Sequence, residues 1–340
     1  MATPSSRLRE SEHNYPAEPL LRVRDLHVHY LTPRGPVRAV DGVSFDISRG
    51  EVLGLAGESG CGKSTVAQAL LRILQPPAVI TGGEVHFGDR DILEMSDDEL
   101  ARFRWKDVSM VFQSAMNALN PVITVGEQIE DVIIAHGAMG KLEARQRAAD
   151  LLDIVGIERN RLDAYPHQLS GGMRQRAVIA IALALNPPLM IMDEPTTALD
   201  VVVQKEIMSQ IDELKRQLGF SILFITHDLS LLVEISTRIA IMYAGQIVEL
   251  ASARDIFERP LHPYTQGLMS SFPSLTGQTE ALTGIPGAPP NLLQPPSGCR
   301  FHPRCQHCKP IFTKIVPPLV EVERDHWVAC HLYTDVGVRA

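Results

Sequence analysis

Alternating and continuous runs of apolar residues mark the first third of the chain. Apolar and polar positions alternate between Leu20 and Ile47 and break at residues 32–35, which predicts two antiparallel strands joined by a turn. The apolar run at 51–57 predicts a buried strand, and residues 65–74 predict a helix that ends before two prolines. A strand, a glycine-rich loop and a helix are therefore expected in direct succession.

The middle of the chain changes from strands to helices. Residues 82–93 predict a hairpin and residues 108–112 predict a buried strand. A helical pattern then extends over about 114–171, with the spacing of a capping box at 124–127 and amphipathic spacing at 141–157. These features predict a helical subdomain inserted into a larger α/β core.

Strands and helices alternate again after this insertion. The runs at 188–195 and 220–226 predict strands, and the helix between them begins at Asp200 and stops at Gly219. Because alternating strands and helices build mostly parallel sheets, the predicted fold class is α/β, with an antiparallel β subdomain before the helical one.

The pattern breaks after about Phe257, where proline becomes frequent, so we place a domain boundary there. The predicted parts are a disordered lead-in (1–19), a main domain (20–258) and a C-terminal extension (259–340). The extension contains four of the five cysteines. A chain of 340 residues is long enough for one large core and a smaller appended lobe.

Charge and hydropathy exclude several classes of partner. The formal net charge is −8, and no run of Lys and Arg is long enough to follow a phosphate backbone, so we expect no nucleic-acid partner. The N-terminus lacks the apolar run of a secretory signal peptide. The most apolar run, residues 177–185, is far shorter than the roughly 20 residues that cross a bilayer, so membrane-spanning helices would have to come from other subunits.

A glycine-rich loop is the clearest chemical signal. Residues 57–65, GESGCGKST, match the phosphate-binding pattern G-x-x-x-x-G-K-[ST] between a predicted strand and a predicted helix. In such a loop, backbone N–H groups surround the phosphates, Lys63 supplies a positive charge and the Ser64 hydroxyl binds magnesium. The predicted nucleotide-binding residues are Gly57, Ser59, Gly60, Cys61, Gly62, Lys63, Ser64 and Thr65. The full motif argues against a glycine-rich turn with a chance lysine.

An acidic pair follows the predicted strand at 189–192. Open parallel sheets bind ligands at the carboxyl ends of their strands, which is where Asp193 and Glu194 are expected. Asp193 would orient magnesium, and Glu194 would polarise an attacking water, a contribution of roughly 10²- to 10⁴-fold in rate. Alone, such a pair could be an ordinary strand end or helix cap. Beside a phosphate loop, it predicts catalysis.

Residues 169–175, LSGGMRQ, resemble the signature motif of the ATP-binding cassette (ABC) ATPases. This resemblance implies a P-loop NTPase (RecA-like) core, with ATP and Mg²⁺ as cofactors and two cassettes clasped head to tail around ATP. It also implies that Ser170 and Gly172, with Gly171 between them, face the γ-phosphate bound by a partner subunit. A flexible linker is the alternative, but a strongly apolar helix follows the motif.

Four further positions resemble cassette elements. Gln113 resembles the Q-loop residue that contacts magnesium and the attacking water, and Asp200, in the segment 198–200, resembles the D-loop at the dimer seam. His227 resembles the switch histidine at the γ-phosphate, although a lone histidine is more often structural. Tyr30 is a candidate for stacking on adenine, and a strand-end tyrosine explains it almost as well. The catalytic set is Glu194, His227 and Gln113, and the magnesium set is Ser64, Gln113 and Asp193.

The tail carries three motifs: HPYTQGLMSSFP (262–273), IPGAPPNLLQPPSGCRFHPRC (285–305) and HWVACH (326–331). They resemble the C-terminal extension of ATPase subunits in oligopeptide and dipeptide ABC importers. This resemblance spans nearly the whole chain from about Leu20 and implies a peripheral subunit at the cytoplasmic face of the membrane. The implied partners are two transmembrane permease subunits, a second ATPase subunit (a copy or a paralogue) and an extracytoplasmic substrate-binding protein.

The cysteines of the extension suggest a metal site. A proline-rich lobe of about 40 residues is too small to be stabilised by its own core, which favours a cross-link. In a reducing compartment, thiolates more often bind zinc or an iron–sulfur cluster than form disulfides. The family resemblance implies a four-iron, four-sulfur cluster with ligands matching Cys299, Cys305, Cys330 and Phe312, and Cys308 would replace the cysteine absent at Phe312. Zinc and four reduced thiols are the alternatives.

Together these features predict an ATP-hydrolysing subunit that powers a membrane importer of peptides. An importer of nickel or another small solute would have the same subunit, so the cargo stays open. A soluble, non-transport ABC ATPase would be expected to carry two cassettes or a long coiled-coil insertion, and the sequence has neither. A metal-sensing module with a degenerate ATPase would lack a catalytic residue, and none is missing.

Overall fold

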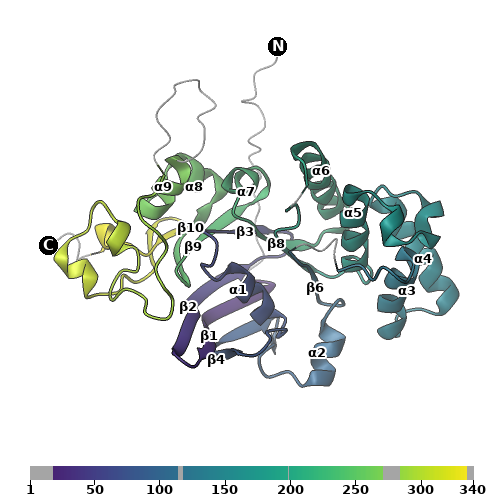
Figure 1. Cartoon of the computed structure of the whole chain (residues 1–340), viewed down its shortest axis with the longest axis horizontal. Coiled ribbons are helices and arrows are strands. Elements are labelled where there is room, and N and C mark those ends of the chain that lie inside the picture. The colour runs from purple at the N-terminus through teal and green to yellow at the C-terminus, as the bar shows by residue number, and fades with distance from the viewer. Residues whose placement is uncertain (1–17, 114–117, 198, 271–283, 335–340) are drawn as a thin grey trace, which may run out of the picture.

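The structure, a computed structural model, describes residues 18–113, 118–197, 199–270 and 284–334. Two sheets and the helices around them make up this part of the chain (Figure 1). Within it, no helix is long and apolar enough to cross a bilayer. The predicted disordered lead-in falls almost entirely on residues 1–17, outside the described ranges.

The N-terminal sheet is antiparallel, with four strands in the described residues in the order β2-β1-β4-β5. The strands are β1 (Leu21–Thr32), β2 (Gly35–Ile47), β4 (Ala78–Phe87) and β5 (Arg90–Asp91). Val23, Leu26 and Val28 of β1 are fully buried between polar neighbours, which is why the alternation predicted strands. The predicted pair, its turn and the later hairpin are confirmed, and α2 (Asp97–Phe103) follows β5.

The central sheet has eight strands among the described residues, in the order β11-β12-β10-β9-β3-β8-β7-β6. Its parallel strands are β3 (Val52–Ala56), β6 (Val108–Val111), β7 (Leu189–Asp193), β8 (Ser221–Ile225) and β9 (Arg238–Tyr243). Every residue of β3, β7 and β8 is buried, as expected for strands covered on both faces. The predicted mostly parallel sheet is confirmed.

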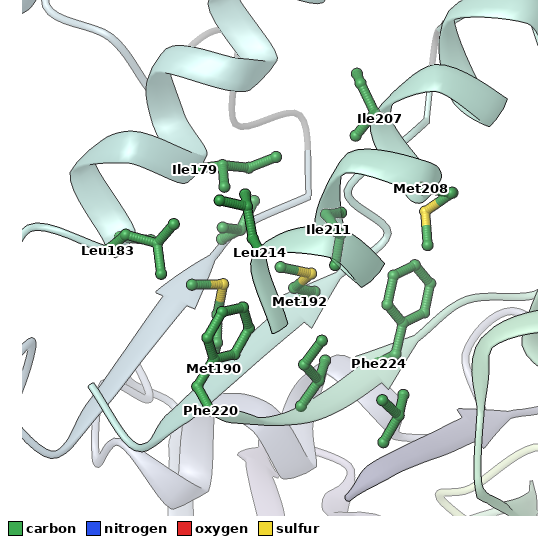
Figure 2. Close-up of a cluster of buried hydrophobic side chains, with 14 of the residues drawn as sticks. Ile179, Leu183, Met190, Met192, Ile207, Met208, Ile211, Leu214, Phe220 and Phe224 are labelled. Carbon is green, nitrogen blue, oxygen red and sulfur yellow. The ribbon is translucent and has the colours of Figure 1, made fainter. Parts of the chain in front are cut away.

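Helices cover the parallel strands and complete the core. They are α1 (Lys63–Leu70), α5 (Gly171–Ala182), α6 (Val201–Leu218) and α7 (Leu229–Ile235). Figure 2 shows Ile179 of α5 and Ile211 and Leu214 of α6 above Met190 and Met192 of β7, all buried. These apolar side chains fix α5 and α6 against the strand that carries the acidic pair. The N-terminus of α5 carries the predicted signature residues, and that of α6 carries the predicted D-loop residue Asp200.

Some element ends differ from the prediction, and the contacts explain two of these differences. The helix expected over 65–74 ends at Leu70, because Arg104 donates from Nε to Leu71 O at 3.1 Å and from Nη2 to Arg72 O at 3.0 Å, so the chain turns. The strand expected to include Phe112 ends one residue earlier, where its pairing with β7 ends, and Phe112 is 41% exposed. In both places the end of the element depends on contacts with a distant segment, which a local sequence pattern does not contain.

The helical insertion contains α3 (Val125–Ala135) and α4 (Lys141–Ile154) and lies at one end of the molecule (Figure 1). The predicted capping box is present, since Thr124 accepts from Glu127 N while the Glu127 side chain accepts from Thr124 N. Residues 114–117 at the start of the predicted subdomain lie outside the described ranges.

The C-terminal extension lies at the opposite end of the molecule (Figure 1). The main domain ends in β10 (Gln246–Ser252) and α8 (Ala253–Glu258), and the extension contains α9 (Pro263–Ser270), β11 (Val320–Glu323) and β12 (His326–Val328). Strand β12 pairs with β10, so the extension continues the central sheet. Tyr264 and Phe301 join the main hydrophobic core, which gives the extension a source of stability besides a cross-link.

Candidate active site

The glycine-rich loop lies between β3 and α1, at the carboxyl end of β3. Gly57 and Gly62 have φ angles of 151° and 109°, which glycine adopts without strain. A Cβ atom would come within 2.1 Å of Met242 O at Gly57 and within 2.1 Å of Ala39 O at Gly62. The loop therefore requires glycine at Gly57 and Gly62, the two glycines that the pattern G-x-x-x-x-G-K-[ST] specifies.

Lys63 starts α1 and is only 6% exposed. Its Nζ donates to Gly57 O at 2.8 Å and to Glu58 O at 3.1 Å. The ammonium group is thus held by two carbonyls of the same loop whose N–H groups surround phosphates in proteins with this motif. The structure places the predicted positive charge at the loop.

Ser64 joins α1 to the end of β7. Its Oγ donates to Asp193 Oδ1 at 3.1 Å. Burial raises the pKa of Asp193, while the hydrogen bond from Ser64 lowers it and Glu194 raises it further. A hydroxyl and a carboxylate oxygen are the donors that Mg²⁺ prefers, so two of the three predicted magnesium ligands lie together.

Three polar side chains converge on Glu194. Gln113 Nε2 and Thr197 Oγ1 each donate to Glu194 Oε2 at 3.0 Å, and His227 Nδ1 lies 3.2 Å from Oε1. Glu194 itself has a φ of 48°, and its N–H donates to Ile225 O at 2.8 Å. The structure thus brings the predicted catalytic set together from three distant segments.

Thr197 was missed by the sequence reasoning, which stopped at the acidic pair. The turn in which Thr197 N donates to Glu194 O at 3.2 Å returns the hydroxyl to the carboxylate. A threonine three residues after a candidate base was the available signal. Glu58 was also missed, and its contacts with the extension are described below.

The predicted signature and D-loop residues lie at the starts of helices. Ser170 Oγ accepts from Met173 N at 3.3 Å and caps α5, and Asp200 caps α6 by accepting two backbone N–H groups. Ser170, Gly171 and Asp200 are exposed, and Gly172 is half-buried. Within the described part of the chain, no hydrogen bond connects these four residues to the phosphate loop. Residue 198, which belongs to the predicted D-loop, lies outside the described residues.

Tyr30, the candidate for stacking on adenine, lies near the end of β1. Its hydroxyl is 3.3 Å from Thr65 Oγ1, so the side chain lies beside the residue that closes the phosphate-binding motif. The contact links the antiparallel sheet to α1. Stacking on adenine stays a prediction.

The five cysteines are free thiols in two places. Cys61 is buried in the phosphate loop, and the extension holds Cys299 and Cys305 half-buried, Cys330 buried and Cys308 exposed. The pKa of Cys299 is raised to about 11 and that of Cys330 to about 12, mainly by burial and in smaller part by Cys305. The three less exposed thiols are thus near enough to influence one another.

Phe312 is the residue at which the resemblance to the importer subunits implies a cysteine. It is 4% exposed and stacks on His331 with ring centroids 4.7 Å apart. Four sulfurs bound at about 2.3 Å to one zinc ion would lie roughly 3.8 Å apart. Among the described residues, the cysteines form no group with three ligand atoms within 4.8 Å of one another.

His27, His29 and Asp41 do form such a group, on the antiparallel sheet. Hydrogen bonds account for most of it: His27 Nδ1 lies 3.0 Å from Asp41 Oδ1, and Nε2 lies 3.0 Å from Asp25 Oδ1. Arg300 donates to the other oxygen of Asp41. A guanidinium group at this position repels a cation, and it pairs with Asp41, which also pairs with His27. His29 Nε2 is buried and has no hydrogen-bond partner in the described residues.

The fold and the site define a class: a P-loop nucleoside triphosphatase. Its phosphate loop, Asp193 and the side chains around Glu194 lie at the carboxyl ends of the parallel strands of one sheet. A family model described as "ABC transporter" matches residues 40–197. A second, described as "Oligopeptide/dipeptide transporter, C-terminal region", matches residues 248–311. The chain belongs to the ABC transporter family, and it is an ABC-type ATPase.

Similar proteins extend the match over most of the chain. The oligopeptide transport ATP-binding protein OppD of Escherichia coli is 46% identical over 316 residues, which cover 92% of this chain and 93% of OppD. The dipeptide transport ATP-binding protein DppD of Bacillus subtilis is 44% identical over 318 residues, covering 93% of this chain and 95% of DppD. The main domain and the extension are thus matched together.

Solved structures match the cassette part. The ATP-binding cassette MJ0796, in a dimeric post-hydrolysis state with ADP and Pi, superposes with a TM-score of 0.62 at 31% identity, covering 69% of this chain and 99% of MJ0796. CbiO1 from Clostridium perfringens, part of the transporter complex CbiONQ, gives a TM-score of 0.62 at 28% identity, with 72% and 92% coverage. The predicted cassette fold is confirmed.

Proposed function

We propose that this ABC ATPase powers the import of oligopeptides or dipeptides across a membrane. The observation that carries the ATPase part is the convergence of Gln113, Thr197 and His227 on Glu194, next to the Ser64–Asp193 pair. The peptide cargo rests on the relatives, which are named oligopeptide and dipeptide transport ATP-binding proteins, and on the matched C-terminal region.

The catalytic roles follow from the donors and acceptors present. Lys63 and the N–H groups of the glycine loop bind the phosphates of ATP, and Ser64, Asp193 and Gln113 hold Mg²⁺, which when bound offsets negative charge on the phosphate oxygens. Glu194 accepts a proton from the attacking water. Hydrogen bonds to both of its carboxylate oxygens fix its orientation, which is the requirement for a general base.

A second cassette completes the site in this proposal. Ser170, Gly171, Gly172 and Asp200 lie at exposed or half-buried helix starts without hydrogen bonds to the chain's own phosphate loop in the described residues. A helix N-terminus favours a negatively charged ligand, so these residues are suited to a γ-phosphate bound by another subunit. The dimeric state of MJ0796 supports a pair of cassettes, and the second one is either a copy or a paralogue of this chain.

The remaining partners belong to the membrane complex. We propose that the chain is peripheral, at the cytoplasmic face of the cell membrane beneath two transmembrane permease subunits, and that an extracytoplasmic substrate-binding protein delivers the peptide. The role of the relatives as transport ATP-binding proteins supports this arrangement. Closure of two cassettes around ATP would move the permeases, and hydrolysis would reset them.

The test is transport by the complete complex in lipid vesicles, with ATP inside and the binding protein outside. ATP-dependent uptake of a labelled dipeptide or pentapeptide is expected, and a complex that carries Glu194→Gln serves as the control that binds ATP without turning it over. Uptake of nickel without uptake of peptides would contradict the proposed peptide cargo but not the proposed ATP hydrolysis. ATP hydrolysis unaffected by Glu194→Gln would overturn the assigned base.

We also propose that the four cysteines of the extension bind an iron–sulfur cluster. The proximity of Cys299, Cys305 and Cys330, each of which affects or is affected by another's pKa, supports this, and Cys308 would be the fourth ligand. Protein purified without oxygen is expected to be brown, with iron and sulfide in equal amounts. Stoichiometric zinc without sulfide, or no metal, would contradict the cluster.

A further inference from the structure

The C-terminal extension contacts the phosphate loop at Glu58. Arg304 donates from Nη1 and Nη2 to the two oxygens of the Glu58 carboxylate, at 2.7 and 3.0 Å. The Glu58 N–H donates to the Tyr264 hydroxyl at 2.9 Å, and the Glu58 carbonyl accepts from Lys63 Nζ at 3.1 Å. Two polar groups of this loop residue are therefore held by the extension, and the third holds the lysine that binds phosphate.

The two anchoring side chains are fixed within the extension and the core. Arg304 is 8% exposed, donates from Nε to Pro286 O at 2.9 Å and lies over the Tyr243 ring, 5.8 Å from its centroid. Tyr264 is fully buried, with its ring centroid 4.6 Å from that of Tyr243 and 5.5 Å from that of Phe301. Neither side chain moves without disturbing this packing, so Glu58 is restrained against a rigid support.

We infer that Arg304 and Tyr264 are positioning residues for the nucleotide site, so that the extension sets the shape of the phosphate loop. This inference rests on the proposed binding of ATP by that loop. A bidentate Arg–carboxylate pair fixes orientation as well as distance, and it is made here to the residue whose carbonyl anchors Lys63. Arg304 also neutralises a carboxylate within a loop that must accept a polyanion, because an unpaired Glu58 would repel the phosphates.

The experiment measures the Kd of the purified full-length chain for a fluorescent ATP analogue with Mg²⁺. Arg304→Met is expected to weaken binding about tenfold, which corresponds to about 1.4 kcal/mol. Adding Glu58→Gln to this variant is expected to restore part of the affinity, because the unpaired charge is gone. Tyr264→Phe keeps the ring but removes the acceptor for the Glu58 N–H. It is expected to weaken ATP binding and, because that N–H loses its partner, to lower the unfolding temperature as well.

Arg300→Met is the matched control. Arg300 is 6% exposed and pairs with Asp41 of β2, so it joins the extension to the main domain as Arg304 does but does not contact Glu58. Equal weakening by Arg300→Met and Arg304→Met would overturn the inference, since loss of docking alone would explain both. Unchanged affinity in Arg304→Met, or no restoration by Glu58→Gln, would overturn it too.

Two further variants keep the outcome decisive. If Arg304→Met does not fold, Arg304→Lys retains the charge but loses the bidentate geometry and is expected to weaken binding about threefold.

Lys63→Ala separates this inference from the proposed function. If Lys63→Ala abolishes ATP binding while the Arg304 variants bind normally, only the positioning role fails. If Lys63→Ala binds normally, the assignment of the nucleotide site fails.

Discussion

His262 makes the stability of the extension sensitive to acid. Its side chain is buried, and its Nδ1 accepts a hydrogen bond from Tyr264 N at 3.0 Å, which requires that nitrogen to be unprotonated. Burial lowers its pKa from 6.5 to about 4, and nearby Glu249 offsets only part of that effect. The folded protein therefore keeps His262 neutral at a pH where the unfolded chain has already bound a proton.

The sign and size of the effect follow from this difference in pKa. Above pH 6.5, His262 is neutral in the folded and in the unfolded protein, and the stabilisation is complete. Below pH 6.5, His262 binds a proton in the unfolded protein but not yet in the folded one, so the stability falls. The fall ends near pH 4, where His262 of the folded protein is protonated too. With 1.36 kcal/mol for each unit of pKa difference, the full loss is about 3 kcal/mol. Between pH 8 and pH 5 it is about 2 kcal/mol.

The assay is urea unfolding at pH 8 and pH 5, for the native chain and for His262→Asn. Asparagine does not titrate, and its side-chain oxygen can accept the N–H two residues later, so the variant preserves the local hydrogen bond. The native chain is expected to lose about 2 kcal/mol more than His262→Asn over this interval. Equal losses in both proteins would refute the reasoning, whatever the absolute stability of the variant.

Three further predictions concern the site and the docking of the extension. Glu194→Gln is expected to retain ATP binding and to lower turnover of the assembled complex by roughly 10²- to 10⁴-fold, and undiminished hydrolysis would contradict its role as base. Lys63→Ala is expected to weaken ATP binding strongly in equilibrium titration, with an unchanged Kd as the contrary result. Glu249→Ala leaves the N–H groups of Leu261 and His262 and the His326 ring without their acceptor, so unfolding should show a loss of roughly 3–5 kcal/mol. A loss below about 1 kcal/mol would contradict the importance of these bonds.

Much of the fold could be predicted because the local patterns and the tertiary structure agree. Alternating apolar and polar residues predict β1 and β2, and continuous apolar runs predict the buried parallel strands. Helix α6 begins after its N-cap, Asp200, and ends before Gly219, as the sequence predicts. The length of α1 could not be predicted, because the groups that end it belong to Arg104, more than thirty residues away. Continuation of the sheet into β12 depends on pairing between segments whose sequences do not identify each other.

The candidate site shows the same division. Motif spacing identified Lys63, Asp193 and Glu194, since these residues follow core strands that the apolar pattern predicts. It could not identify Arg304 as a partner of Glu58, because a pair separated by 246 positions leaves no local signature. The tail motifs resemble the extension of importer ATPases and contain cysteines. The residues of these motifs that contact the phosphate loop are Arg304 and Tyr264.

The pairing of β12 with β10 also determines which strand lies at one border of the central sheet, opposite the border formed by β6. In the described residues that strand is β11, which has four residues including Glu321 and Glu323, both exposed. Short, charged border strands resist pairing with other molecules, whereas β10 has five consecutive buried residues. A chain shortened to end at Glu258 would uncover β10 and is expected to self-associate through it, so the extension also protects solubility.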